Sequence, residues 1–139
     1  MDLSKLYSTK PFSDKTLNWL LRGSLAVVYI WFGLLKIFNI SPVAGLIQAL
    51  YPSFTQFHFI IILGVWEVVI GVGFLAQRTA RWAVYLMWLQ MVGIFAGLVV
   101  APDLFFSRVP WILTTDGEFV IKNLVLLVAS LVVLRETKE

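Results

Sequence analysis

The chain has 139 residues, of which 60% are hydrophobic and only 14% are charged. A water-soluble domain of this length could not bury so much apolar surface in one core, so the composition excludes a soluble catalytic module. The chain has no cysteine and one histidine, which excludes thiolate chemistry, iron–sulfur clusters and a bis-histidine haem. We therefore expect a single integral membrane domain over residues 1–139, with no covalent cofactor and no metal.

Four apolar segments reach or approach the length of about 20 residues that crosses the hydrocarbon core of a bilayer. In chain order they cover residues 17–40, 57–76, 82–101 and 118–134. The sequence thus predicts an all-α fold, an integral membrane bundle of four transmembrane helices. The connection between the second and third segments, residues 77–81, is short and polar and predicts a simple turn.

The positive charges are unevenly distributed over the two sides of this bundle. Eight of the eleven lysines and arginines belong to the side that carries both chain ends. The positive-inside rule then places both termini in the cytoplasm, and we expect the cytoplasmic (inner) membrane of a bacterial-type cell. The topology accounts for the basic residues and leaves no separate basic stripe, so we expect no nucleic-acid partner.

The two connections on the outer side are long and apolar. Residues 43–50 carry apolar side chains at helical spacing, which predicts a short helix lying along the membrane interface. Ser41 and Pro42 predict its N-cap and its first residue. Residues 102–117 form an aromatic-rich loop, which we expect to pack over the bundle as a lid. Anchoring of aromatic side chains in the interface explains both connections equally well.

A carboxylate lies in the middle of the second segment. An unpaired charge near the bilayer midplane costs at least ~2.5 kcal/mol, so Glu67 must be protonated, paired or placed in a wet cavity. Gln90 lies midway along the third segment, at matching depth. Lys36 lies near the outer end of the first segment, and Lys122 and Asn123 lie near that of the fourth. We expect Glu67 to pair with Lys36 or Lys122, and the two amides to hydrogen-bond to it.

Each of these residues also has a purely structural interpretation. Lys122 stands four residues after Glu118 and can form a local pair with it. Lys36 can simply mark the outer boundary, and the two amides can join helices by hydrogen bonds. Trp31 and Trp66 could line a flat aromatic pocket beside the cluster, although tryptophan also anchors helix ends.

Three stretches carry a family resemblance: residues 29–38 (YIWFGLLKIF), Trp66-Glu67, and residues 117–127 (GEFVIKNLVLL). Together they resemble the DoxX-like family of small four-helix membrane proteins, over about residues 20–134. The resemblance implies a four-helix bundle with cytoplasmic termini. Family members are linked to sulfur-compound oxidation feeding quinone, to oxidative-stress resistance and to accessory roles beside redox enzymes. The positions carried over are Gly33, Lys36, Pro42, Glu67, Gly71, Gly117, Lys122 and Asn123.

Three functions follow as hypotheses, and we favour the first. It is a redox-associated subunit that binds a quinone or another lipophilic molecule near the outer leaflet. The chain has no self-contained catalytic or electron-carrying site, so electrons would come from a partner subunit. The second is a structural or assembly subunit of a larger membrane complex. The third is a small oligomeric transporter with Glu67 on its pathway. The expected partners are the lipid bilayer and another membrane or redox subunit, or a second copy.

Overall fold

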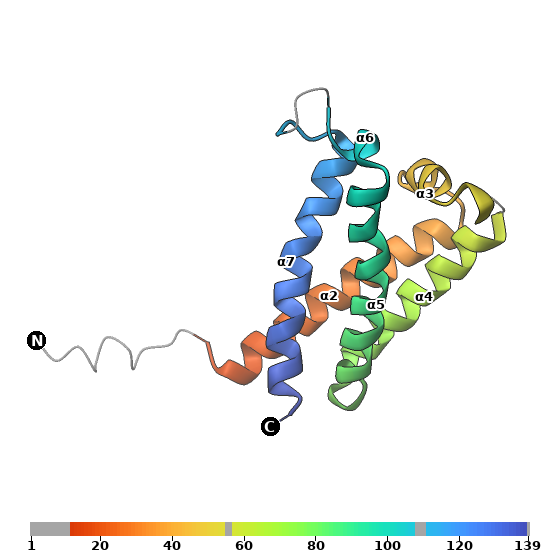
Figure 1. Ribbon diagram of the computed structural model, residues 1–139. Coiled ribbons are helices and arrows are strands. Elements are labelled where there is room, and N and C mark those ends of the chain that lie inside the picture. Colours follow the sequence, from red (N-terminus) through yellow and green to blue (C-terminus); the bar gives the residue numbers. More distant parts are fainter. Residues whose placement is uncertain (1–11, 55–56, 108–110, 139) are drawn as a thin grey trace, which may run out of the picture.

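The computed structural model describes residues 12–54, 57–107 and 111–138. Most of this part of the chain is helical, and a single β-bridge within it joins Phe106 and Leu113. The elements in chain order (Figure 1) are α2 (Asp14–Ile37), α3 (Ala44–Leu50), the 3₁₀ turn η1 (Pro52–Phe54), α4 (Phe57–Leu75), α5 (Gln77–Val100), α6 (Pro102–Phe105) and α7 (Thr115–Glu136). The helices α2, α4, α5 and α7 are long and apolar enough to cross a membrane. The prediction of an all-α fold with four such helices is confirmed.

The turn predicted at residues 77–81 is wrong, because this segment is the first part of α5. The chain reverses at Ala76, whose backbone is extended (φ −103°, ψ 136°). The Thr79 hydroxyl then donates to the Gly73 carbonyl at 2.7 Å and ties the start of α5 to the end of α4. Hydropathy identifies only the part of a helix that lies in hydrocarbon. A polar first turn that lies outside the hydrocarbon carries no free-energy penalty. The sequence pattern therefore placed the start of this helix too late.

Helix α2 ends at Ile37, before the limit of 40 that hydropathy predicts, and its end is well defined. Asn39 has a left-handed backbone (φ 57°). The Asn39 N–H donates to the Lys36 carbonyl at 3.1 Å, and the Ile40 N–H donates to the Leu35 carbonyl at 2.9 Å. These two bonds form a Schellman motif, in which a left-handed residue closes the helix. Lys36 thus lies in the last turn of α2, where the helix dipole favours a positive charge.

Helices α2 and α4 run antiparallel with their backbones in direct contact. A Cβ on Gly33 would lie 2.6 Å from the Gly64 carbonyl oxygen, and a Cβ on Gly64 would lie 2.7 Å from the Gly33 carbonyl oxygen. Further along, a Cβ on Gly71 would lie 2.6 Å from the Ile30 side chain. Small residues at such crossings let helices approach closely in a membrane. The glycines therefore fix the relative height of residues on the two helices.

The other two long helices, α5 and α7, run side by side and lie at an angle to α2 and α4 (Figure 1). The Trp88 indole N–H on α5 donates to the Ser130 hydroxyl on α7 at 2.8 Å. The hydrophobic core lies between the helices and includes Tyr29, Phe74 and Met87. Each long helix nevertheless keeps an exposed apolar face. A lipid environment accounts for these exposed faces, since hydrocarbon does not penalise them.

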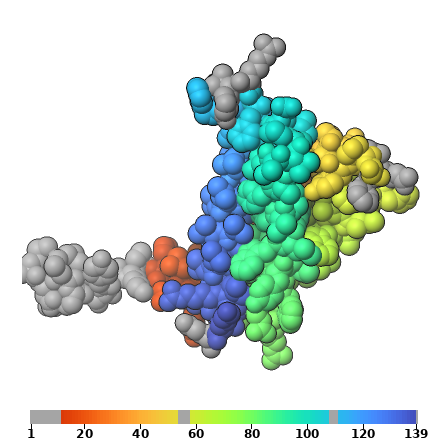
Figure 2. Space-filling view, viewed as in Figure 1, coloured from red at the N-terminus to blue at the C-terminus, as the bar shows by residue number. Residues whose placement is uncertain are grey.

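The short helix expected within residues 43–50 is present as α3, but its predicted start is wrong. Val43 is the N-cap and makes no capping bond, and Ser41 and Pro42 lie before the helix. The Ala44 N–H instead donates to the Ser41 backbone carbonyl at 3.3 Å, so these residues form a turn. Figure 2 shows α3 packed against the neighbouring ends of α4 and α5.

The second outer connection begins with α6, which packs onto the ends of α5 and α7. Phe105 is fully buried, and a Cβ on Gly117 would collide with the Phe105 carbonyl oxygen. The Ser107 N–H donates to the Ile112 carbonyl at 2.8 Å, and Trp111 is 81% exposed. In the described part of this connection, Phe105 is therefore anchored in the bundle and the Trp111 side chain is exposed. Its role as a lid stays a prediction.

The glycine contact between α2 and α4 can be tested with two matched substitutions on α2. Gly33→Ala should lower the free energy of unfolding in detergent by about 1–3 kcal/mol, because its methyl group meets the backbone of α4. Gly23→Ala should leave stability unchanged or raise it by about 0.5–1 kcal/mol, since nothing lies within 4 Å of the added Cβ. Thermal unfolding followed by circular dichroism measures both, and equal stabilities would contradict the packing described here.

Candidate functional site

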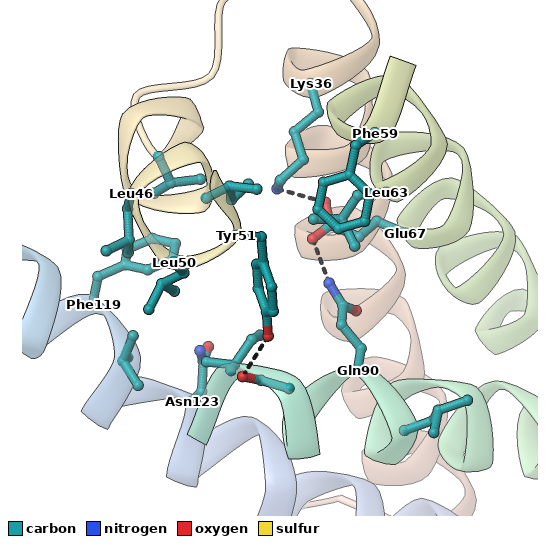
Figure 3. A pocket seen from close by; sticks show the side chains of 16 residues that line it. Lys36, Leu46, Leu50, Tyr51, Phe59, Leu63, Glu67, Gln90, Phe119 and Asn123 are labelled. Atoms are coloured by element: carbon teal, nitrogen blue, oxygen red, sulfur yellow. Dashed lines mark hydrogen bonds and ion pairs between the residues drawn. The ribbon is translucent and has the colours of Figure 1, made fainter. Parts of the chain in front are cut away.

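A charged pair lies in the interior of the bundle. The Lys36 ammonium on α2 and Oε2 of Glu67 on α4 are 2.7 Å apart (Figure 3). The Gln90 amide on α5 donates to the other carboxylate oxygen, Oε1, at 2.7 Å. Lys36 is only 4% exposed and Glu67 only 7%. Of the two pairs that the sequence allowed, the structure forms the one with Lys36.

The glycine contact between α2 and α4 explains how this pair forms. Lys36 follows Gly33 by one turn, and Glu67 follows Gly64 by one turn, so both side chains lie on the faces in contact. Lys36 lies level with Gly64, and Glu67 follows Gly64 by three residues, so the two residues lie about 4.5 Å apart along the axis. The lysine stem spans this distance by running over Gly64, where an added Cβ would lie 2.9 Å from the Lys36 Cβ.

Side chains of the protein itself supply hydrogen bonds to both carboxylate oxygens of Glu67. Each oxygen of Glu67 accepts one strong hydrogen bond, one from an ammonium and one from an amide. The positive charge of Lys36 balances the negative charge, so the pair has no net charge in the hydrocarbon region. Removing one partner of such a buried pair leaves an uncompensated charge, which is far more costly than removing both.

An apolar cavity of about 240 Å³ opens beside this cluster, under α3 (Figure 3). All four long helices contribute to its wall, and Lys36, Glu67, Gln90 and Asn123 provide its polar part. Small-molecule sites commonly have this composition, a mostly apolar wall with a few polar groups that orient the ligand. The apolar wall includes Leu46, Leu50, Phe59, Leu63, Ile94 and Phe119.

The segment that covers the cavity is attached to α5 by a hydrogen bond. The Tyr51 hydroxyl, just after α3, donates to the Gly93 carbonyl at 3.0 Å (Figure 3). Gly93 leaves room for this contact, because a Cβ there would lie 3.2 Å from the hydroxyl oxygen. Leu50 approaches Gly97 in the same way, one turn further along α5. The two glycines of α5 thus accommodate the end of α3.

A second hollow of about 40 Å³ is lined by the same four polar residues, Lys36, Glu67, Gln90 and Asn123. Its remaining wall comes from α2, α5 and α7 and includes the buried Tyr29. The polar cluster therefore borders two hollows, a large one under α3 and a small one inside the bundle.

The cluster retains unused hydrogen-bonding capacity. The Gln90 carbonyl oxygen is buried and has no partner in the part of the chain that the structure describes. Lys36 has three N–H groups and uses one of them on Glu67. Asn123 faces the cavity with an amide that can both donate and accept. The site can thus bind a carbonyl oxygen and a hydroxyl group at the same time.

Three residues that the sequence suggested for this site lie elsewhere. Lys122 is exposed on α7, although its neighbour Asn123 is buried. Trp31 is 65% exposed, and Trp66 packs against the hydrophobic core. Neighbouring residues on a helix point about 100° apart, so Trp66 and Lys122 face away from the cavity that Glu67 and Asn123 line. Of the two alternative pairs, the one with Lys122 therefore does not form, and Trp31 and Trp66 do not line this cavity.

The aromatic side chains that do line the cavity are Tyr51, Phe59 and Phe119. Sequence reasoning missed all three, and it also missed Tyr29 in the smaller hollow. Tyr51 lies in a connection whose path cannot be derived from hydropathy. The one sequence signal that could have placed Phe119 at the site is its spacing from Asn123. It lies four residues before Asn123 and therefore shares its face of α7.

These features define a class of protein: a multi-pass membrane protein whose bundle holds a buried ion pair beside an apolar cavity. Among the described residues, no group of histidine, aspartate and glutamate could hold a metal ion. No known protein family, no curated protein and no solved structure matches the chain. The similarity to the DoxX-like family therefore remains a prediction from sequence motifs.

The ion pair can be tested by a double-mutant cycle. Glu67→Gln should lower the free energy of unfolding by about 3–5 kcal/mol, because Lys36 then stays buried without a counter-charge. The double variant with Lys36→Met should recover most of this loss, since it removes both charges. Lys122→Met, which changes an exposed lysine, should stay within about 0.5 kcal/mol of wild type. Strictly additive effects of Glu67→Gln and Lys36→Met on the free energy of unfolding would show that the two charges are not coupled.

Proposed function

We propose that this protein is a redox-associated, DoxX-like membrane subunit that binds a quinone or another lipophilic small molecule under α3. One observation supports the proposal: the apolar cavity of about 240 Å³ whose polar wall is a buried, hydrogen-bonded ion pair. An apolar ring with carbonyl groups matches such a wall, because the ring needs apolar contact and each carbonyl needs a donor.

The polar residues would have separate roles in ligand binding and in proton transfer. Lys36 and Asn123 would donate hydrogen bonds to a carbonyl oxygen of the ligand. Glu67 would hold the proton that the ligand gains or loses, and Gln90 would orient the carboxylate through its 2.7 Å bond. Reduction of a bound quinone takes two electrons and two protons, and the electrons would come from a redox partner subunit.

The proposal includes an orientation in the membrane. Both termini would lie in the cytoplasm of a bacterial-type cell, with the protein in the inner membrane, as the distribution of lysine and arginine indicates. Helix α3 would then lie at the outer interface and the cavity would open near the outer leaflet. The connection over residues 102–117 would form a lid beside α3. None of its described residues lines the cavity, so α3 would be the main cover.

A second candidate is a structural or assembly subunit of a larger membrane complex. The observation that favours it is that both carboxylate oxygens of Glu67 are already bonded within the chain. Fixing the register of neighbouring helices is a sufficient role for a buried pair of this kind. In that case the cavity would have no specific ligand, and removal of the charges would weaken assembly with the other subunits.

Ligand binding can be measured with a short-chain ubiquinone analogue and the protein in nanodiscs. Leu63→Trp should reduce binding at least about tenfold, because the indole fills the cavity that Leu63 lines. Ile62→Trp is the matched control, since its position on the same helix is 62% exposed, and it should bind as wild type does. The double variant Lys36→Met/Glu67→Gln should also bind more weakly.

Empty nanodiscs give the background partitioning of the quinone into lipid. If wild-type protein binds no more quinone than this background, the proposal of a quinone site fails. If Leu63→Trp and Ile62→Trp reduce binding equally, the ligand lies elsewhere on the protein.

A further inference from the structure

A second buried polar group lies at the other end of α2, far along the chain from the ion pair. Asn18 and Arg22 are each only 8% exposed. They stand four residues apart, so their side chains lie one above the other on the same face of the helix. Their neighbours Trp19 and Leu20 are exposed. At this height α2 therefore turns these two polar side chains toward the inside of the bundle.

The buried Arg22 guanidinium has few partners among the residues that the structure describes. One N–H of Arg22 donates to the Phe74 carbonyl near the end of α4 at 3.5 Å, which is the outer limit of a hydrogen bond. The Nε atom of Arg22 and the carbonyl oxygen of Asn18 are both buried without a partner among the described residues. A guanidinium has five N–H groups, and the hydrogen bonds to described residues account for one of them.

The position of Arg22 along the helix sets its depth in the membrane. It lies about 12 Å from the first residue of α2 and one turn beyond Trp19. Exposed tryptophans typically lie at the membrane interface, and Trp82 near the start of α5 is exposed at the same end of the bundle. A long arginine side chain can extend from this depth toward the headgroups. The guanidinium is thus within reach of a lipid phosphate group.

From these observations we infer that Asn18 and Arg22 form a binding site for a phosphate group that carries a neighbouring hydroxyl. The two-pronged guanidinium matches two phosphate oxygens, and the charges compensate each other in a region of low dielectric constant. The Asn18 carbonyl oxygen needs a donor, which a hydroxyl supplies. The headgroup of phosphatidylglycerol has both features, and so has inorganic phosphate.

The surrounding charge favours an anion at this end of the bundle. Arg78 and Arg81 lie at the start of α5, and Arg135 lies in the last turn of α7, so these helix ends also carry positive charge. Basic pockets between transmembrane helices bind anionic headgroups in this way. Phosphatidylcholine is a poor match, because its headgroup has a cationic group and no hydroxyl.

Native mass spectrometry of the intact protein, released from nanodiscs of equal phosphatidylglycerol and phosphatidylcholine, tests the site. Wild type should retain phosphatidylglycerol about tenfold over phosphatidylcholine. Arg22→Gln should reduce this ratio to about one, whereas Arg78→Gln, which changes an exposed arginine at the same end, should leave it unchanged. Asn18→Leu keeps the guanidinium and removes the acceptor, so it should reduce the ratio severalfold.

A second measurement distinguishes the source of the phosphate. In nanodiscs of phosphatidylcholine alone, inorganic phosphate at constant ionic strength should raise the melting temperature of wild type but not of Arg22→Gln, if the ligand is free phosphate. Retention of phosphatidylglycerol without this shift identifies the lipid headgroup. If neither ligand distinguishes wild type from Arg22→Gln, Arg22 only caps α4 and the inference is overturned. If Arg22→Gln does not fold, unchanged lipid retention by Asn18→Leu overturns it equally.

Discussion

A carboxylate in the middle of an apolar helix dominates this structure. A charge in hydrocarbon is tolerated only when it is paired or solvated, and here one lysine and one glutamine satisfy both oxygens of Glu67. These bonds come from three helices, so the arrangement of the bundle must bring α2, α4 and α5 together at one point. The cavity under α3 and the hollow around Tyr29 both lie against this point.

The chain distributes its polar groups unevenly between the two ends of α2. Near its C-terminal end, Lys36 is balanced by a carboxylate from the neighbouring helix. Near its N-terminal end, Arg22 makes a weak bond to a helix carbonyl as its one hydrogen bond among the described residues. The first cluster pairs a cation with an anion, whereas the contacts among the described residues give the second cluster a bond to a carbonyl oxygen and no counter-charge. The first therefore suits a neutral, lipophilic ligand, and the second suits an anion.

The sequence predicted the helices better than it predicted the site. Apolar runs identified the four long helices, because hydrocarbon imposes a length and a composition that few other structures share. The pairing of Glu67 with Lys36 was one of two alternatives, since depth alone cannot show which face of α7 Lys122 occupies. The glycine contacts that select Lys36 depend on the rotation of both helices. Tyr51 was missed because the path of a connection depends on tertiary packing.

The contact of Gly64 with the stem of Lys36 has a consequence for the history of this protein. A methyl group at position 64 would meet the Gly33 carbonyl oxygen at 2.7 Å and the Lys36 Cβ at 2.9 Å, so it would push the two helices apart where Lys36 reaches Glu67. The glycines at 33 and 64 and the charges at 36 and 67 therefore cannot drift independently during evolution. Related chains should either keep all four residues or replace them together. Joint replacement would identify the lineages that have lost the buried ion pair.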